Sequence, residues 1–155
     1  MTGRILAVSY ARVSSDDQRE AETIALQREM VPRWCPERGI ELYRTYEDDG
    51  VSGTVMFPER PGGARLLRDL PELRAAGVTL LLLYNWSRLG REPWVVWGAI
   101  YDLEKLGGLR LRSVTEEADT STPERVLMLC LGTGMASMER ARFIQVSRDA
   151  TNLRA

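Results

Sequence analysis

The sequence predicts an α/β fold with a mainly parallel sheet of four to five strands flanked by helices, on three observations. Short apolar segments alternate along the chain with segments whose apolar residues recur at helical spacing. The run from Val78 to Tyr84 is continuously apolar, which is typical of a strand buried on both faces of a parallel sheet. No repeat or linker divides the 155 residues, so we expect one layered unit with a substantial core.

Four segments have the pattern of strands, since each is short, apolar and bounded by turn-forming residues. They are residues 4–10, 40–46, 78–84 and 109–115. The carboxyl ends of parallel strands meet at one edge of the sheet, and ligands of α/β folds bind there, near a switch in strand order. We therefore expect functional side chains directly after the first and third of these segments.

The helices are expected between the strands. The first should have its N-cap at Ser14 or Ser15, because two acidic residues follow and favour the positive end of a helix dipole. Gly39 should end this helix, and Pro32 should kink or split it. The other expected helices are residues 62–76, 93–106 and 123 to about 154.

The composition disfavours a metal or another cofactor. The chain has no histidine, which is the usual general base and a frequent zinc ligand. Cys35 and Cys130 lack metal-type spacing, and we expect them to be buried, reduced thiols of a cytoplasmic protein. Asp48 and Asp49 follow a strand, but no third carboxylate stands at a neighbouring strand end, which favours a capped turn over a metal site.

The charge limits how the chain could bind an acidic partner. Its net charge is −1, whereas a self-sufficient DNA-binding domain normally carries a basic face. Of the 21 basic residues only Lys105 is a lysine, so a catalytic cation here would be a guanidinium, which binds phosphate oxygens through a two-pronged fork. There is no secretory signal and no run of about 18 apolar residues, so no membrane partner is expected.

A serine and several arginines follow two of the expected strands. Ser14 comes after the first, with Arg12 two residues earlier on the same side of an extended backbone. Gln18 stands one helical turn further on. Arg88 and Arg91 follow the third strand, three residues apart and hence on one face of a helical turn. A hydroxyl surrounded by guanidinium groups suits attack on a phosphodiester, because the cations stabilise the charge of the transition state.

Five motifs, in order, resemble those of the serine recombinases, the family of resolvases, invertases and large serine integrases. They are Tyr10-Ala11-Arg12-Val13-Ser14-Ser15 with Gln18, Thr23-Ile24-Ala25-Leu26-Gln27, Asp48-Asp49-Gly50-Val51-Ser52-Gly53, Glu59-Arg60-Pro61-Gly62 and Ser87-Arg88-Leu89-Gly90-Arg91. The resemblance spans nearly the whole chain and is greatest to the large integrase and transposase group. It implies a resolvase-like three-layer fold with a long C-terminal dimerisation helix.

The resemblance also implies a role for each matching residue. Ser14 would be the nucleophile that forms a phosphoserine bond with a DNA 5′ end. Four arginines would bind and polarise the scissile phosphate, and two glutamines would position groups around it. These six residues are Arg12, Arg60, Arg88, Arg91, Gln18 and Gln27. The implied enzyme is a site-specific recombinase that cuts and rejoins DNA of a mobile element without a metal.

One position departs from the family pattern. Ser87 stands where the motif usually has an aspartate that is thought to orient an arginine or to help in proton transfer. A serine donates and accepts hydrogen bonds but carries no charge. We still expect activity, because the arginines supply most of the electrostatic stabilisation. The alternative is a catalytically degenerate recombinase fold that only oligomerises.

The resemblance divides the chain into a catalytic domain at 1–134 and the start of the dimerisation helix at 135–155. The implied partners are double-stranded DNA at a specific recombination site and further copies of the chain, as a dimer on each site and a tetramer joining two sites. We expect sequence recognition, and most of the DNA affinity, to belong to a part beyond Ala155.

A receiver-like or nucleotide-binding domain is the alternative from another class. A receiver needs an aspartate for phosphorylation at the end of its third strand and a lysine at a later strand end. The chain offers Asn85 and Ser87 at the first of these places and no lysine at the second, which disfavours this alternative.

Overall fold

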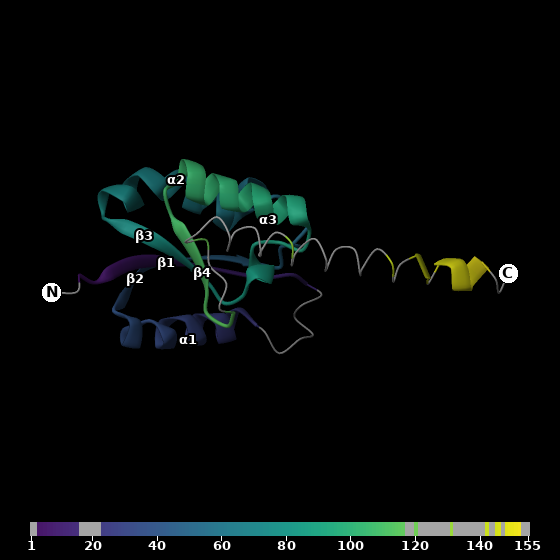
Figure 1. Ribbon diagram of the computed structural model, residues 1–155, viewed down its shortest axis with the longest axis horizontal. Coiled ribbons are helices and arrows are strands. Elements are labelled where there is room, and N and C mark those ends of the chain that lie inside the picture. The colour runs from purple at the N-terminus through teal and green to yellow at the C-terminus, as the bar shows by residue number, and fades with distance from the viewer. Residues whose placement is uncertain are drawn as a thin grey trace.

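The computed structural model describes residues 3–15, 23–116 and 120, together with 131, 142, 145–146 and 148–152. These residues contain a four-stranded parallel sheet between two layers of helices (Figure 1). The strands are β1 (Ile5–Val13), β2 (Ile40–Asp49), β3 (Val78–Leu83) and β4 (Arg110–Ser113), in the spatial order β2-β1-β3-β4. The predicted α/β fold with a parallel sheet is therefore confirmed.

The helices lie on both faces of the sheet, and the direction of each step from one strand to the next decides which face a helix covers. They are α1 (Ile24–Trp34), α2 (Pro61–Ala75) and α3 (Pro93–Ile100), which continues into the π-helical turn η5 (Tyr101–Leu106). The chain steps one way from β1 to β2 and the other way from β2 through β3 to β4. Right-handed crossovers then place α1 on one face and α2 and α3 on the other, as Figure 1 shows. The strand order therefore changes direction between β1 and β3.

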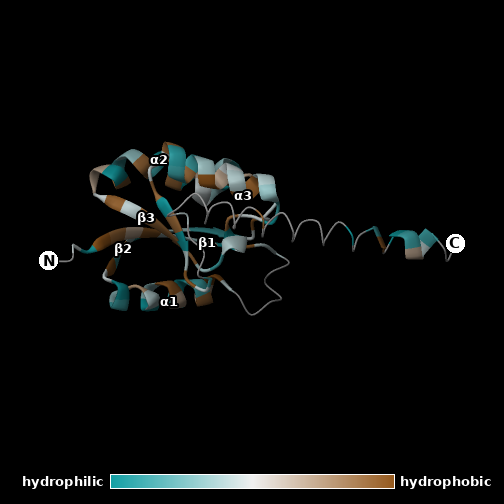
Figure 2. Ribbon diagram, viewed as in Figure 1, coloured by the Kyte–Doolittle hydropathy of each residue, from teal (hydrophilic) through white to brown (hydrophobic). Residues whose placement is uncertain are grey.

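Apolar side chains on both faces of the sheet form the core, and the central strands are accordingly mostly hydrophobic in Figure 2. The larger cluster, against α2 and α3, includes fully buried Leu66, Leu81 and Leu103. The smaller cluster, against α1, includes Val31 and Cys35. Cys35 is a buried free thiol as expected, and its burial raises its pKa. Burying this apolar surface is the main force that holds the layers together.

The first helix differs from its prediction at both ends. Its N-cap is Thr23, whose hydroxyl oxygen accepts the Leu26 N–H at 3.2 Å, and not Ser14 or Ser15. A serine before two acidic residues is typical of a cap, but the buried helical face starts only at Ile24. The helix also continues through Pro32 without interruption and ends at Trp34. A proline in the last turn removes only one hydrogen bond of the helix.

Two strands extend further than the apolar pattern predicted. Arg12 and Val13 still belong to β1, where they pair with Asp48 and Asp49 of β2. The extension matters because it fixes Arg12 within a strand rather than in a loop. A charged residue at a buried strand position is not expected from hydropathy, and its bonding partners explain it below.

The polar segment after β2 is anchored by one aromatic residue. Phe57 begins the short 3₁₀ turn η3 (Phe57–Glu59) and is fully buried. Its ring lies edge-on to that of Tyr10, with 4.9 Å between the ring centroids. Edge-to-face pairs of this kind add to the gain from burial. Phe57 thereby fixes the segment that leads into Arg60 and α2.

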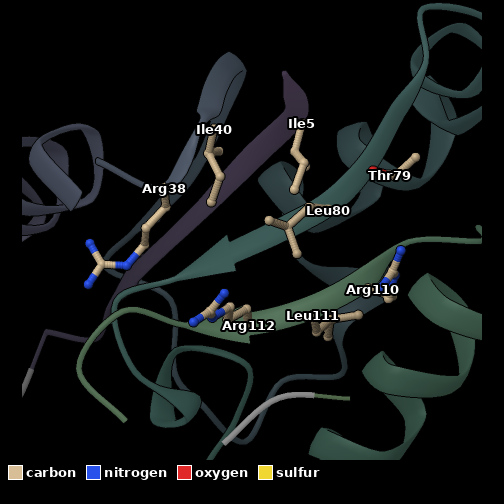
Figure 3. Close-up of a pocket in the computed structure, with 8 residues that line it drawn as sticks. All are labelled: Ile5, Arg38, Ile40, Thr79, Leu80, Arg110, Leu111 and Arg112. Carbon is tan, nitrogen blue, oxygen red and sulfur yellow. The ribbon is translucent and has the colours of Figure 1, made fainter. Parts of the chain in front are cut away.

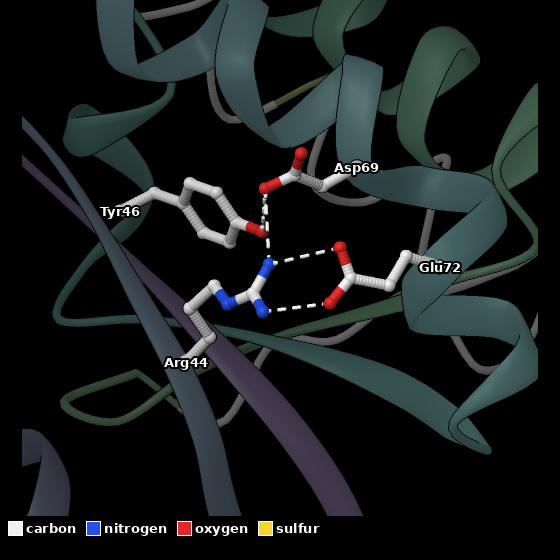
Figure 4. Close-up of polar contacts among 4 residues, drawn as sticks. All are labelled: Arg44, Tyr46, Asp69 and Glu72. Carbon is white, nitrogen blue, oxygen red and sulfur yellow. Dashed lines mark hydrogen bonds and ion pairs between the residues drawn. The ribbon is translucent and has the colours of Figure 1, made fainter.

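A polar cluster fastens the edge strand β2 to α2 (Figure 4). Arg44 donates to Glu72 Oε1 at 2.7 Å and to Asp69 Oδ2 at 3.1 Å. The Tyr46 hydroxyl donates to the same Asp69 oxygen at 2.8 Å. Burial, together with this carboxylate, raises the pKa of Tyr46 to about 12. These contacts hold α2, and the segment before it, against the sheet.

Two further expectations concern residues that the structure describes only in part. The long C-terminal helix falls mostly outside the described residues, although 131, 142, 145–146 and 148–152 are helical. Cys130 also lies outside them. None of the helices within the described ranges is both long and apolar enough to cross a membrane.

Candidate active site

The predicted serine lies at the point where the chain changes direction between β1 and β3. Ser14 directly follows β1, and its side chain is almost fully buried. Arg91 follows β3, and its Nη2 lies 3.5 Å from Ser14 Oγ. Two residues 77 positions apart in the sequence thus meet at the carboxyl edge of the sheet. This is the place where α/β folds bind their ligands.

Arg12 is a buried cation that joins three parts of the chain. It is fully buried within β1, and its guanidinium donates to the carbonyl oxygens of Val51 and Ser87, each at 2.9 Å. Its Nε donates to the carbonyl of Arg88 at 3.1 Å. Hydrogen bonds to a charged donor are stronger than neutral ones, and they offset the cost of burying the charge. Arg12 therefore holds the loops after β2 and β3 against the end of β1.

Arg60 forms a second buried cation beside the first. It is fully buried at the start of α2, where it donates to the carbonyls of Val55 at 3.0 Å and Leu89 at 2.6 Å. Its Nη1 donates to the Tyr10 hydroxyl at 3.2 Å and to the Arg88 carbonyl at 3.3 Å. The Arg88 carbonyl thus accepts from both Arg12 and Arg60, so the two guanidinium groups converge on one oxygen.

Tyr10 and Asp48 take part in this site, although neither was predicted as a site residue. The Tyr10 hydroxyl donates to Asp48 Oδ2 at 2.8 Å. Asp48 also accepts the backbone N–H groups of Gly62 at 2.7 Å and Gly63 at 3.0 Å, so it caps the first turn of α2. A Cβ at Gly62 would lie 2.3 Å from the Glu47 carbonyl oxygen, so this close approach requires glycine. Burial raises the pKa of Tyr10 well above its usual value, and the phenol stays protonated.

Gln27 contacts the backbone of Arg12 rather than any side chain of the site. Its amide accepts the Arg12 N–H and donates to the Arg12 carbonyl, both at 3.3 Å. β3 pairs with β1 only as far as Tyr10, so Gln27 satisfies backbone groups of β1 beyond the end of β3. Gln18, the other predicted glutamine, lies outside the described residues.

Arg88 donates hydrogen bonds to uncharged oxygens of Arg12, Asn85 and Ser87. Its Nη1 donates to the Arg12 carbonyl at 2.6 Å, and its Nε donates to Asn85 Oδ1 at 3.0 Å. Its Nη2 donates to Ser87 Oγ at 3.1 Å, so Ser87 lies beside the guanidinium as the motif predicted. Asn85 was not predicted as a site residue, and only its position two residues before Ser87 could have indicated it. The structure therefore brings Arg12, Arg60 and Arg88 together through shared carbonyl oxygens, and Arg91 to the side of Ser14.

The turn after β2 packs directly against two of these arginines. The Gly53 carbonyl accepts the Arg91 N–H at 3.0 Å. A Cβ at Gly53 would lie 2.7 Å from Arg91 Cγ and 3.0 Å from Arg12 Nη2. A larger residue at Gly53 would therefore displace Arg91 and Arg12, so the acidic-glycine motif of the sequence lets the turn after β2 pack against both arginines.

Comparison with known proteins agrees with this geometry. Residues 7–155 match the model of the resolvase N-terminal domain. The chain belongs to the resolvase family. The "Probable DNA-invertase y4cG" of Sinorhizobium fredii is 32% identical over 135 residues, which are 86% of this chain and 38% of that protein. The DNA-invertase of Escherichia phage P1 is 31% identical over 143 residues, which are 92% of this chain and 67% of that protein. The resolvase-family chain thus spans well under half the length of the first of these relatives.

Solved structures resemble this resolvase-family domain over most of its length. The N-terminal catalytic domain of TP901-1 integrase has a TM-score of 0.67 at 25% identity, and the match covers 88% of this chain and 97% of that one. A resolvase-family site-specific recombinase from Streptococcus pneumoniae has a TM-score of 0.66 at 21% identity, covering 97% and 99%. The second likeness concerns the fold alone.

A cavity of the resolvase-family domain lies away from Ser14. It has a volume of about 170 Å³ and is lined by residues at the starts of three strands, among them Ile5 and Ile40, and by Arg110 and Arg112 of β4 (Figure 3). Strand starts are at the opposite end of a parallel sheet from Ser14, so this cavity is not the predicted site. Within the described residues, no three histidine, cysteine or acidic side chains are grouped as a metal site would require.

Proposed function

We propose that this domain is the catalytic domain of a site-specific serine recombinase, which cleaves and rejoins DNA through a bond between Ser14 and a 5′ phosphate. The observation that carries the proposal is the buried Ser14 hydroxyl beside Arg91, next to the hydrogen-bonded cluster of Arg12, Arg60 and Arg88. Membership of the resolvase family and similarity to a DNA-invertase support it.

The proposed reaction exchanges one phosphodiester for another. Ser14 Oγ forms a bond to the phosphorus, the bond from phosphorus to the 3′ oxygen breaks, and the proton lost by the serine is balanced by the one that the 3′ hydroxyl gains. Rejoining is the reverse attack by a 3′ hydroxyl from the exchanged end. No energy source is needed, because the number of phosphodiester bonds is conserved.

The arginines are assigned different tasks by their contacts. Arg91, whose Nη2 lies 3.5 Å from Ser14 Oγ, is proposed to stabilise the developing negative charge of the hydroxyl and the scissile phosphate. Arg88 is proposed to bind a non-bridging phosphate oxygen. Arg12 and Arg60 bind backbone carbonyls, so we assign them the task of holding the loops while adding positive potential. Gln27 fixes the end of β1, and Gln18 is proposed to contact the phosphate.

The proposal includes partners and a division of the chain. We propose double-stranded DNA at a specific site as the substrate, in the cytoplasm, with residues 1–134 as the catalytic part. We propose residues 135–155 as the start of a helix through which copies form a dimer and then a tetramer. Helical residues 145–146 and 148–152 support this. Val146 is 67% exposed, which suits an apolar residue that packs against another copy of the chain.

A second candidate is a degenerate module that keeps the fold and the association but has lost the chemistry. The specific observation in its favour is that Arg12 and Arg60 direct their guanidinium groups at backbone carbonyls, which is a structural task. The uncharged Ser87 agrees with it.

Covalent trapping separates the two candidates. The chain is fused to a DNA-binding domain of known preference and mixed with DNA that carries this preference on both sides of a randomised centre. We expect a protein–DNA adduct stable to denaturant, and its complete loss in Ser14→Ala. Ser15→Ala is the matched control, since this neighbouring serine is exposed, and it should form the adduct normally. Equal adduct from Ser14→Ala would refute the proposal, and a folded, self-associating protein without adduct would favour the degenerate module.

A further inference from the structure

Asn85 occupies a position where asparagine normally caps a helix, yet it does not do so. It precedes the 3₁₀ turn η4 (Trp86–Arg88) with an extended backbone, φ −148° and ψ 169°, and its side chain makes no capping bond. An asparagine at this position usually accepts a backbone N–H of the first turn. Here the Arg88 N–H bonds the Asn85 backbone carbonyl at 3.2 Å, and the Trp86 N–H bonds Glu116 Oε2 at 3.2 Å. The Asn85 side chain therefore takes no part in capping this turn.

The Asn85 oxygen is directed at the guanidinium of Arg88. Oδ1 accepts the Arg88 Nε–H at 3.0 Å and the Ser87 hydroxyl at 2.6 Å. Ser87 Oγ in turn accepts Arg88 Nη2 at 3.1 Å. Asn85 and Ser87 thus hold one edge of the guanidinium, and the Arg12 carbonyl holds the third nitrogen at 2.6 Å. Three contacts around a planar group fix both its position and its plane.

We propose that Asn85 is a positioning residue, whose amide oxygen orients Arg88 toward the scissile phosphate without neutralising its charge. The inference rests on the proposed function. A guanidinium has five N–H donors on three nitrogens, and the contacts to Asn85, Ser87 and the Arg12 carbonyl engage one donor on each nitrogen. A neutral amide oxygen orients such a group without the ion pair that a carboxylate would form. Ser87 contributes by holding the Asn85 oxygen in place.

The positioning is tested first without DNA, on the 155-residue chain itself. Exchange of the Arg88 Nε–H proton with water is measured by nuclear magnetic resonance. We expect slow exchange in the wild type and in Asn85→Asp, which keeps an oxygen acceptor in the same place. Asn85→Leu has the same size but no acceptor, and its exchange should be faster by about tenfold or more. Unchanged exchange in Asn85→Leu would overturn the inference.

The consequence for the reaction is tested in the fusion described above. Asn85→Leu should form the DNA adduct about a hundredfold more slowly, since small misplacements of a catalytic group have effects of this size. DNA affinity and the thermal unfolding temperature should stay near the wild-type values, and Asn85→Asp should restore the rate to within about tenfold. Wild-type rates in Asn85→Leu, or equal losses in both variants, would overturn the inference.

A double-mutant cycle separates positioning from a general structural role. Lysine in place of Arg88 has no Nε–H for Asn85 to orient, so Asn85→Leu should cause no further loss of rate in the Arg88→Lys background. The full loss appearing again in that background would overturn the inference. The proposed function itself fails in a different way, by the absence of any Ser14-dependent adduct in the wild type.

Discussion

The arginines clustered near Ser14 and those paired with carboxylates on α1 and β2 are held in opposite ways. Arg60, at the start of α2, is fully buried and donates to three backbone carbonyls and a phenol oxygen. Arg28, which is exposed, and Arg44, which is half-buried, are paired with the carboxylates of Glu47 and Glu72. The charges of Arg28 and Arg44 thus face carboxylates, whereas the guanidinium of Arg60 donates to uncharged oxygens.

The difference shows how the chain can concentrate positive charge despite a net charge of −1. Exposed ion pairs are screened by water and salt and contribute little to stability. A buried guanidinium that is bonded to carbonyl oxygens holds the fold together and keeps its positive charge, because the dipole of a carbonyl does not cancel a full charge at a distance. A cluster of such arginines attracts a phosphate while its cations hold the loops in place. The predictions below test this contrast between the two regions.

The largest expected effect is on stability, from removing a buried cation. Arg60→Leu deprives the carbonyls of Val55 and Leu89 and the Tyr10 hydroxyl of their donor. Each unsatisfied buried group costs about 1–3 kcal/mol, so we expect the free energy of unfolding to fall by about 4 kcal/mol. Denaturant titration measures it. Arg28→Leu is the matched surface variant and should show no measurable change. Similar losses in both variants would remove the contrast.

Next in size is the effect of Arg91 on the reaction. Arg91→Ala should slow adduct formation about a hundred- to a thousandfold, because it removes a guanidinium that lies 3.5 Å from Ser14 Oγ. The free energy of unfolding should change much less than in Arg60→Leu, since Arg91 is only partly buried. Arg33→Ala, which breaks a surface pair with Glu29, is the control and should leave the rate unchanged. A rate loss in Arg60→Leu without one in Arg91→Ala would contradict the assignment of charge stabilisation to Arg91.

A smaller effect is expected from filling the space beside the guanidinium groups. In Gly53→Ala the new methyl group would contact Arg91 Cγ and Arg12 Nη2. Overpacking of this kind costs about 1–3 kcal/mol, and we expect the displaced Arg91 to lower the adduct rate about tenfold. Gly3→Ala, where nothing lies within 4 Å, should change neither quantity. An unaltered rate in Gly53→Ala would contradict this prediction, since Arg91 and Arg12 would then move aside without cost to the reaction.

The smallest effect concerns alkaline pH. The pKa of Tyr46 is raised to about 12 by burial and by the Asp69 carboxylate, and burial raises that of Tyr10 as well. Above about pH 10 the unfolded chain releases phenol protons that the folded chain keeps. The unfolded state then binds fewer protons, so the free energy of unfolding should fall as the pH rises further. Tyr46→Phe should reduce this slope in denaturant titrations, and an equal slope would contradict the assignment.

The fold could be predicted from the sequence because it depends on local patterns. Alternating apolar strands and helices predicted the parallel sheet. Gly39, with φ 65°, ends the 3₁₀ turn η2 (Pro36–Arg38), whereas the first helix itself already ends at Trp34. The cap of α1 could not be predicted, since Ser14 and Thr23 both have the chemistry of a cap and only tertiary packing selects Thr23. The extension of β1 through Arg12 was missed for a similar reason, because the carbonyls that accept its charge come from distant loops.

Residues of the candidate site could be predicted from the sequence only where they belong to a recognisable motif or follow a predicted strand. The meeting of Ser14 with Arg91 followed from parallel topology, which brings strand ends together. Asn85 and Tyr10 could not be found in this way, because their tasks depend on hydrogen bonds to groups brought close by folding. The geometry also assigns Arg12 a structural contact with three carbonyls, which no pattern in the sequence predicts.

The attachment point of DNA is the most direct test of the account. The trapped adduct of the fusion protein is digested with protease and nuclease, and mass spectrometry locates the residue that carries the nucleotide. We expect the nucleotide phosphate on Ser14, on the peptide that follows β1, and on no other serine. A nucleotide attached to Ser15, Ser87 or any other residue would contradict the assignment of the nucleophile.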